Sequence, residues 1–415
     1  MSDNYNILII LHTEYERSNF DEGIEHKSNN IYYFGENKYL QTIPKRLKHN
    51  KIFSPSKEIL EKHIINEIGK LNITFDFIIA NSELTLMPAA KVRQELNISG
   101  SKPDQVEKVT NKVVMKNFIK KSGINIPKYL SLEYALKNKV YAEKLFKRDK
   151  IVLKPINGSG SEGVYFYENF GFLYQEISKL NINIIDYEVE EYIPGEIYHL
   201  DALVCDKSVI EYIPSKYINT CADFANGEPL GSFQIAKKKQ YLELLKKTIN
   251  ALDIEIGAVH LEIIKSTKDD EYYFLEVANR TGGAEIRTLF SEKTGINFSA
   301  SECSLQINKT IIYNSRKKRN SYFGFFQIPG HHLNFEYCKI VGLEKWLKHP
   351  NLLKMTCLDE RKKISKTITY RPDKLPVSMT LKASSPSTLE KLIKDIFQDK
   401  EIQILPTMNE TNYVK

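Results

Sequence analysis

The run Ile151-Val-Leu-Lys-Pro-Ile-Asn-Gly-Ser-Gly-Ser-Glu-Gly-Val164 is the most informative stretch of this chain. An apolar segment typical of a buried strand ends in Lys154, and a loop with three glycines follows directly. Glycine lets backbone N–H groups approach phosphate oxygens closely, because it tolerates positive φ and has no side chain. The run therefore predicts a phosphate-binding loop beside a lysine, with an ordinary strand and hairpin turn as the alternative.

Two carboxylates further along the chain favour a cation beside those phosphates. Glu262 and Glu276 lie on two strand-like runs joined by the polar turn 266–271, so a hairpin would place them on one face. Mg²⁺ prefers a few carboxylates together with substrate phosphates. The residues around Glu262 are mostly apolar, and a lone buried carboxylate there would be costly. Solvent-facing glutamates on a hairpin are the alternative.

Three basic side chains near this hairpin are further candidates. Arg280 follows Glu276 by four residues, and an arginine beside a metal site is suited to stabilising a transferring phosphoryl group. Arg287 could bind a substrate carboxylate bidentately, or form a surface ion pair. His260 shares the face of Glu262 and either orients substrate or is a buried core histidine.

The acidic run 188–196 suggests recognition of a base. Strand alternation places Glu190 and Tyr192 on one face and Glu191 and Ile193 on the other. A carboxylate near an adenine amino group, with exposed backbone groups at Ile193, would recognise the base. An exposed acidic edge is the alternative.

The first hundred residues alternate strand and helix signals, at 7–11, 57–71 and 75–80. This order predicts a parallel α/β unit, in which ligands sit beyond the C-terminal strand ends. Glu83 falls at such an end and is a candidate substrate residue, with a helix cap at Ser82 as the competing interpretation.

The middle of the chain reads as mixed α+β with a substantially antiparallel sheet. Helices are predicted at 106–122 and 239–252, and strands at 150–155, 163–167, 187–193, 197–205, 209–214, 256–264 and 271–277. The segment 214–234 predicts a mobile substrate loop or an inert connection. After residue 310, short β-like runs at 321–328, 339–343, 366–370 and 377–383 precede a helix at 387–397.

Six stretches in this order resemble the ATP-grasp superfamily, in particular its carboxylate–amine (or –thiol) ligase branch. They are residues 111–115, 152–155, 157–164, 190–193, 259–262 and 275–283. The resemblance implies a three-lobed fold of α/β and α+β class. Its parts are an N-terminal parallel α/β lobe (1–103), ATP-grasp lobes with mixed and antiparallel sheets (104–310), and a β-rich cap (311–415) that resembles biotin-carboxylase-like members.

The resemblance also implies roles for individual residues. Those expected to bind ATP are Lys112, Lys154, Ser159, Gly160, Ser161, Glu190, Glu191, Ile193 and Glu196. For the acidic residue that contacts the ribose, Ile197 occupies one candidate position and Glu196 the neighbouring one. Those expected to hold Mg²⁺ or Mn²⁺ are Glu262 and Glu276, while Arg280 and Lys154 would act on the phosphorylated intermediate. Where many members have an asparagine as a further metal ligand, this chain has Ala278 with Asn279 beside it.

The implied activity is an ADP-forming ligase that activates a carboxylate as an acyl phosphate and joins it to an amine. Three alternatives stay open: a thiol acceptor, as in the loading of a carrier protein; a bicarbonate-dependent, carboxylase-like reaction; and a non-catalytic nucleotide-binding module.

The composition of the chain limits the classes of partner that we expect. With 415 residues, 42% hydrophobic and 27% charged, the chain is typical of a soluble globular protein, and it contains no apolar run of the roughly 20 residues that a membrane span requires. The N-terminus lacks the basic region of a signal peptide, and five scattered cysteines form no CxxC pair, so a reducing cytoplasm is expected. The net charge of +7 includes the basic run 316–319, a candidate nucleic-acid patch; a solvated loop is favoured because no aromatic stacking platform accompanies the run. We therefore expect small-molecule partners, no nucleic acid and no membrane, with a carrier protein and a homodimer as further candidates.

Overall fold

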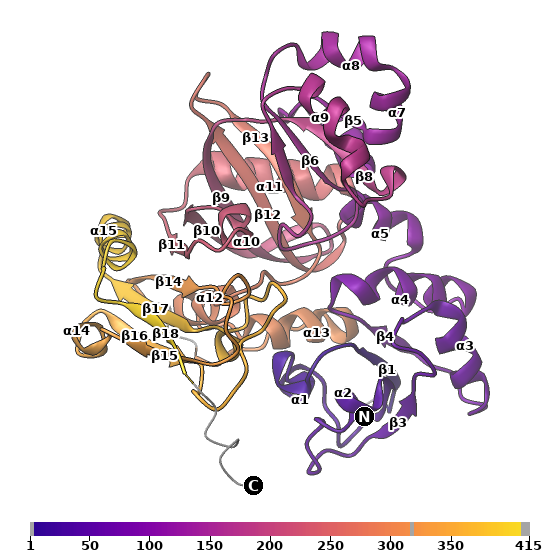
Figure 1. The fold of residues 1–415 in the computed structure, drawn as a ribbon. Helices are drawn as coiled ribbons and strands as arrows, with labels where there is room; N and C mark the ends of the chain where they lie inside the picture. Colours follow the sequence, from indigo (N-terminus) through magenta and orange to yellow (C-terminus); the bar gives the residue numbers. More distant parts are fainter. Residues whose placement is uncertain (1–3, 316–318, 408–415) are drawn as a thin grey trace, which may run out of the picture.

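A computed structural model describes residues 4–315 and 319–407 (Figure 1). The N-terminal part is a parallel sheet of order β3-β2-β1-β4, as the sequence predicts. Its strands are β1 (Asn6–Leu11), β2 (Asn30–Gly35), β3 (Asn50–Phe53) and β4 (Phe77–Ile79). Helices α1 (Phe20–Gly23) and α2 (Asn37–Leu40) contribute apolar side chains to one face of the sheet, and α3 (Glu61–Gly69) and α4 (Glu83–Glu95) contribute theirs to the other.

A second, antiparallel sheet has the order β5-β8-β6-β7. Its strands are β5 (Tyr129–Ser131), β6 (Ile151–Pro155), β7 (Tyr165–Tyr167) and β8 (Tyr187–Glu191). One face packs on α7 (Leu132–Lys137), α8 (Lys139–Phe146) and α9 (Phe170–Glu176), which lie at the top of Figure 1. Alternation along β6 buries Leu153 against these helices and turns Lys154 to the other face.

The third sheet has eight strands in the order β13-β12-β9-β10-β11-β14-β17-β16, and all pairs are antiparallel. Its strands are β9 (Gly195–Cys205), β10 (Ser208–Ile218), β11 (Leu230–Gln234), β12 (Ile256–Ser266), β13 (Tyr272–Ala278), β14 (Tyr322–Ile328), β16 (Leu352–Cys357) and β17 (Val377–Ala383). One sheet therefore runs continuously through residues on both sides of position 310.

Helices cover both faces of the eight-stranded sheet. Residues of α6 (Lys112–Lys121) and α11 (Lys239–Leu252) join the core on one face, and residues of α12 (Ile286–Thr294) and α13 (Phe298–Asn308) join the core on the other. Cys303 of α13 also packs into the core of the N-terminal sheet. The remaining elements are α5 (Pro103–Thr110), α10 (Cys221–Ala225), α14 (Glu344–Leu347), α15 (Pro386–Phe397), a ribbon of β15 (Cys338–Val341) with β18 (Gln403–Pro406), and short 3₁₀ turns at Tyr15–Arg17, Ile177–Lys179, Ile184–Asp186 and Pro372–Lys374.

Three elements differ from their prediction. The helix predicted at 106–122 is divided into α5 and α6 at Asn111, whose side chain accepts hydrogen bonds from the amides of Val113 and Val114 and so begins a new helix. The segment 214–234 is no loop, because it contains the end of β10, α10 and β11. Residues 366–370 form no strand.

The basic run 316–319 lies outside the described residues except for Arg319. Within the described part of the chain, no helix has both the length and the apolar character needed to cross a membrane.

Candidate active site

A cavity of about 330 Å³ lies between the four-stranded antiparallel sheet and the eight-stranded sheet. Its walls come from β6 and β8 on one side and from β9, β12 and β13 on the other. It brings together most of the predicted nucleotide and metal residues, namely Lys112, Lys154, Ser159, Gly160, Ser161, Glu190, Glu191, Ile193, Glu262 and Glu276.

The two predicted metal ligands are direct cross-strand partners. Glu262 on β12 is in register with Glu276 on β13, so their side chains share the face that lines the cavity. One carboxylate oxygen of Glu262, Oε1, accepts hydrogen bonds from Tyr217 Oη at 3.0 Å and from His260 Nε2 at 3.2 Å. Two facing carboxylates that line this cavity fit a hard divalent cation.

Asn279 does not join this pair. Its side-chain amide donates to the backbone carbonyls of Ile256 and Ala258 and so fixes the start of β12. Ala278, which is in register with His260, adds no further oxygen. Protein ligands from this hairpin are therefore limited to the two glutamates.

Lys112 connects the carboxylate pair to the glycine loop. It is the first residue of α6, immediately after the Asn111 cap, so the helix start fixes its position. Its Nζ lies 3.4 Å from Oε2 of Glu276 and donates to the carbonyl of Gly158 at 2.8 Å. Because a new helix begins at Lys112, the side chain of this lysine reaches the cavity.

Lys154 belongs to a buried group of two lysines and two glutamates. Its Nζ lies 2.6 Å from Oε1 of Glu190, while Lys116 Nζ lies 2.6 Å from Oε2 of Glu190 and 2.5 Å from Oε1 of Glu188. The side chains are at most 6% exposed. Burial raises the pKa of Glu190, but the two lysines outweigh burial and lower the pKa to about 2. The four charges therefore compensate one another.

Lys116 and Glu188 were not among the predicted site residues. A lysine in an amphipathic helix is normally solvent-exposed, and its partner Glu188 is 72 residues away. One feature of the sequence could have indicated Lys116 as a site residue. It follows Lys112 by four positions, so both lysines lie on one face of α6.

The predicted base-binding segment is only partly as expected. Both oxygens of Glu190 face lysines, and the Glu191 carboxylate is directed to Lys128 at 3.7 Å, although both residues line the cavity. The amide of Ile193 makes no hydrogen bond with any other described residue. Both glutamate carboxylates therefore face lysines, whereas the Ile193 amide has no partner among the described residues.

Glu196 lies away from the cavity, in contrast to the prediction. Its neighbours Gly195 and Ile197 line the cavity, and Glu196 instead forms an ion pair with Lys216 at 2.6 Å. Alternation along β9 is the reason, because adjacent strand residues point to opposite faces.

The glycine loop is held at two points. Gly158, Gly160 and Gly163 all have positive φ, so the path of the loop depends on glycine. Besides the bond from Lys112 to Gly158, Tyr370 Oη donates to the carbonyl of Gly160 at 3.1 Å. The Tyr370 ring stacks on Phe224 with centroids 4.7 Å apart.

The predicted residues Glu83, Arg280 and Arg287 do not line the cavity and lie where the chain after β13 meets the N-terminal part. Arg280 Nε donates to Glu83 Oε2 at 2.8 Å. Arg287 Nη1 donates to the carbonyl of Arg17 at 2.5 Å, and within the described residues no carboxylate forms an ion pair with its guanidinium. Glu302 on α13 accepts from the amide of Thr281 at 3.0 Å.

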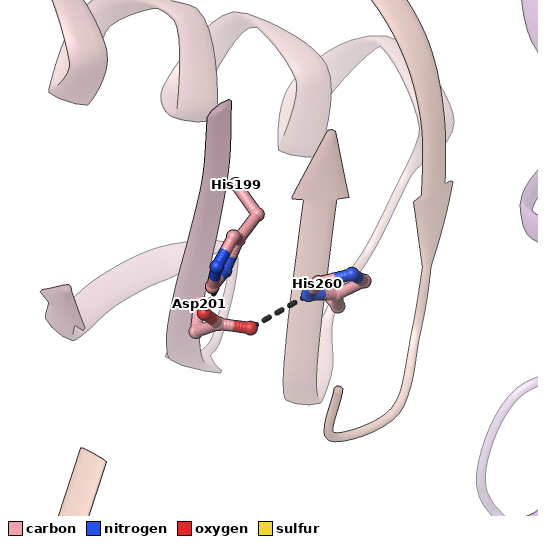
Figure 2. A group of neighbouring side chains, drawn as sticks. All are labelled: His199, Asp201 and His260. Atoms are coloured by element: carbon pink, nitrogen blue, oxygen red, sulfur yellow. Dashed lines mark hydrogen bonds and ion pairs between the residues drawn. The ribbon is translucent and has the colours of Figure 1, made fainter. Parts of the chain in front are cut away.

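His260 is part of a buried chain of polar groups (Figure 2). Its Nδ1 lies 2.7 Å from Oδ1 of Asp201, whose Oδ2 lies 2.6 Å from Nδ1 of His199. Nε2 of His199 continues the chain to Ser232 Oγ at 2.7 Å. Burial lowers the pKa of His260, but Asp201 and Glu262 outweigh burial and raise the pKa to about 10. Neither His199 nor Asp201 was predicted as a site residue.

Comparison with known proteins agrees with this geometry. Residues 109–284 match the ATP-grasp domain family. The chain carries an ATP-grasp domain. The resemblance inferred from the six sequence stretches is thereby confirmed.

The relatives of this ATP-grasp protein include two named amino acid ligases. An L-arginine-specific L-amino acid ligase from Bacillus subtilis is 26% identical over 315 residues, which cover 72% of each chain. The structure of an L-amino acid ligase from Bacillus licheniformis superimposes with a TM-score of 0.72 at 20% identity, covering 98% of this chain and 100% of the other. Biotin carboxylase from Campylobacter jejuni gives 0.63 at 15% identity, covering 97% and 92%. An ATP-dependent carboxylate–amine ligase is confirmed as the class of enzyme.

Proposed function

We propose that this ATP-grasp protein joins two amino acids through an acyl phosphate, with release of ADP and phosphate. The observation that carries the proposal is the convergence of Lys112, Lys154, the glycine loop and the Glu262–Glu276 pair on one cavity. The similarity to amino acid ligases supports amino acids as both substrates.

The nucleotide would lie between the two antiparallel sheets. The unbonded amide of Ile193 is suited to donate a hydrogen bond to a ring nitrogen of adenine, and the cavity wall there includes Tyr192. Lys112 and Lys154 would contact the phosphates, with Ser159 and Ser161 of the loop above them. Glu190 holds Lys154 in this role through its 2.6 Å contact.

Glu262 and Glu276 would hold Mg²⁺ or Mn²⁺. A cation there supplies charge neutralisation for the phosphoryl group that is transferred. Lys112, 3.4 Å from Glu276, adds a second positive charge on the same side of the cavity.

The reaction divides into two steps. An oxygen of the substrate carboxylate attacks the γ-phosphorus and the bond to the β-phosphate oxygen breaks, which gives an acyl phosphate and ADP. The nitrogen of the second amino acid then attacks the acyl carbon, the carbon–oxygen bond to phosphate breaks, and the amine loses a proton. Positioning and electrostatic stabilisation supply most of the catalysis in such a sequence.

Arg280 would stabilise the negative charge of the acyl phosphate, and Glu83 would hold Arg280 or an incoming amino group. Arg287 is suited to bind a substrate carboxylate, because its guanidinium has no ion-pair partner within the described residues. The glycine loop, anchored by Lys112 and Tyr370, would shield the acyl phosphate from water.

A pairwise screen of amino acids tests the proposal. Each pair is incubated with MgATP, phosphate and ADP release are measured, and products are identified by mass spectrometry, with Glu262→Gln as the matched inactive variant. We expect ATP turnover that requires amino acids, a product with the mass of a dipeptide, and hydroxamate formation when hydroxylamine replaces the acceptor. Turnover that depends on bicarbonate or on a thiol, or nucleotide binding without turnover, would contradict the proposal.

A further inference from the structure

The polar chain behind Glu262 lies on the same face of the eight-stranded sheet as the cavity. Asp201 is in register with His260, and His199 is in register with Glu262, so the four side chains form a block on two adjacent strands. The same alternation places the apolar neighbours Leu200 and Leu261 in the core on the opposite face. Strand register alone therefore directs this chain of hydrogen bonds toward the carboxylate pair.

The hydrogen bonds leave one oxygen of Glu262 available to the cavity. Its Oε1 accepts hydrogen bonds from both His260 Nε2 and Tyr217 Oη. Its Oε2 makes no hydrogen bond with any other side chain in the described part of the protein. A carboxylate held at one oxygen is restricted in rotation, so the other oxygen keeps a fixed direction.

Asp201 determines which way His260 points. A carboxylate only accepts hydrogen bonds, so both histidine Nδ1 atoms that face Asp201 act as donors. His260 Nδ1 is thereby committed to Asp201, and its Nε2 is aimed at Glu262. His199, anchored at its far nitrogen by Ser232, fixes the other oxygen of Asp201.

The contacts among these residues have the lengths of hydrogen bonds rather than the separations of ligands around a bound Zn²⁺. Ligand atoms around a tetrahedral Zn²⁺ lie about 2.0–2.2 Å from the ion and hence about 3.3 Å from one another. The contacts of Asp201 to the two histidines are 2.6 and 2.7 Å, which are hydrogen-bond distances. The ligand atoms of His199, Asp201 and His260 all lie within 4.8 Å of one another, and Asp201 hydrogen-bonds to both histidines (Figure 2).

We propose that Asp201 is a positioning residue for the cation site: by orienting His260, it fixes the Glu262 carboxylate so that Oε2 is presented to the cation. The inference rests on the proposed role of Glu262 as a cation ligand. Asp201 itself does not line the cavity. Its effect is therefore transmitted through His260.

The test measures Mn²⁺ binding to the full-length protein with a non-hydrolysable ATP analogue, by the loss of the free Mn²⁺ signal in electron paramagnetic resonance. We expect Asp201→Asn to weaken Mn²⁺ binding about tenfold, because partners of metal ligands typically contribute 10–100-fold to affinity. Binding of the analogue without metal should be unchanged. The matched control is Glu211→Gln. Glu211 lies on the neighbouring strand β10, and its buried carboxylate forms an ion pair with Lys237.

Further variants separate the possible outcomes. If Asp201 acts through Glu262, then adding Asp201→Asn to Glu262→Gln should weaken Mn²⁺ binding no further. Unchanged Mn²⁺ binding in Asp201→Asn, or equal loss in the Glu211→Gln control, would overturn the inference while leaving the role of Glu262 intact. Unchanged binding in Glu262→Gln would instead overturn the proposed cation site. Stoichiometric zinc in the purified protein, lost in His199→Gln, would also overturn the inference.

Discussion

Arg280 Nε, just after β13, and Glu83 Oε2, at the start of α4, form a 2.8 Å ion pair. The two residues are separated by 197 positions in sequence, and both side chains are only 19% exposed. The pair holds the guanidinium between the β12–β13 hairpin, whose two glutamates line the cavity, and the N-terminal part of the chain. An acyl phosphate formed at the cavity edge would meet an arginine that is already oriented.

The first prediction concerns this pair. Arg280→Lys should lower the ligation rate about 100-fold, since removal of one preorganised donor to a developing anion costs about that much. Glu83→Gln should lower it by about fivefold to tenfold, because the amide keeps an acceptor for Arg280 but loses the charge. Steady-state kinetics measure both effects, with nucleotide affinity by calorimetry expected to stay constant. Glu61→Gln, which removes a surface ion pair to Lys91, is the control.

Much of the site could be predicted because its parts are close in sequence. Glu262 and Glu276 are joined by a short turn, so alternation alone indicated their register, and α11 spans the predicted residues 239–252. Lys154 and the glycine loop are contiguous. Such local features are determined by strand and helix periodicity, which a sequence displays directly.

What could not be predicted depends on contacts between distant segments. Lys116 is buried because it pairs with Glu188 and Glu190, which lie on a strand about 70 residues later. The periodicity of α6 gives no indication of these distant partners. Glu196 was placed at the ribose although alternation along β9 turns it to Lys216. Tyr370 reaches the glycine loop from a segment that was expected to be a strand.

The second prediction concerns the buried charge group. Lys116→Met should destabilise the protein by about 3–5 kcal/mol, because it leaves two glutamates buried with one lysine. The double variant Lys116→Met with Glu188→Leu should recover most of this loss, since the remaining Lys154–Glu190 pair is again neutral. Unfolding by denaturant measures the free energy of unfolding of both variants. A double variant as unstable as the single one would contradict the charge argument.

The third prediction concerns the anchor of the glycine loop. Tyr370→Phe removes the hydrogen bond to Gly160 but keeps the ring stack on Phe224. A hydrogen bond contributes about 1 kcal/mol, so the loop should open roughly five times more often. We expect a matching rise in the ratio of phosphate released to dipeptide formed, because water then reaches the acyl phosphate. Tyr313→Phe, at a largely exposed tyrosine, should leave this ratio unchanged.

The fourth prediction concerns Glu302, whose carboxylate accepts the amide of Thr281 beside Arg280. Burial raises the pKa of Glu302 to about 7, although the charges of Arg287 and Arg280 oppose the shift. The pKa of Glu302 in the folded protein lies above the ordinary value of 4.5. Protonation of Glu302 therefore makes its full contribution to the stability of the folded state below pH 4.5. This stabilisation, about 3 kcal/mol at most, is lost as the pH rises through about 7.

Glu302→Gln should therefore change the pH dependence of stability. Its uncharged amide keeps an oxygen for Thr281, so the variant should match the wild type near pH 5 and melt at a higher temperature near pH 8. Thermal unfolding across this range measures the difference. Glu285→Gln, which alters another buried carboxylate, directly before α12 and bonded to Thr288, controls for the loss of a carboxylate as such. A difference between Glu302→Gln and the wild type that does not vary with pH would show that Glu302 does not titrate in this range.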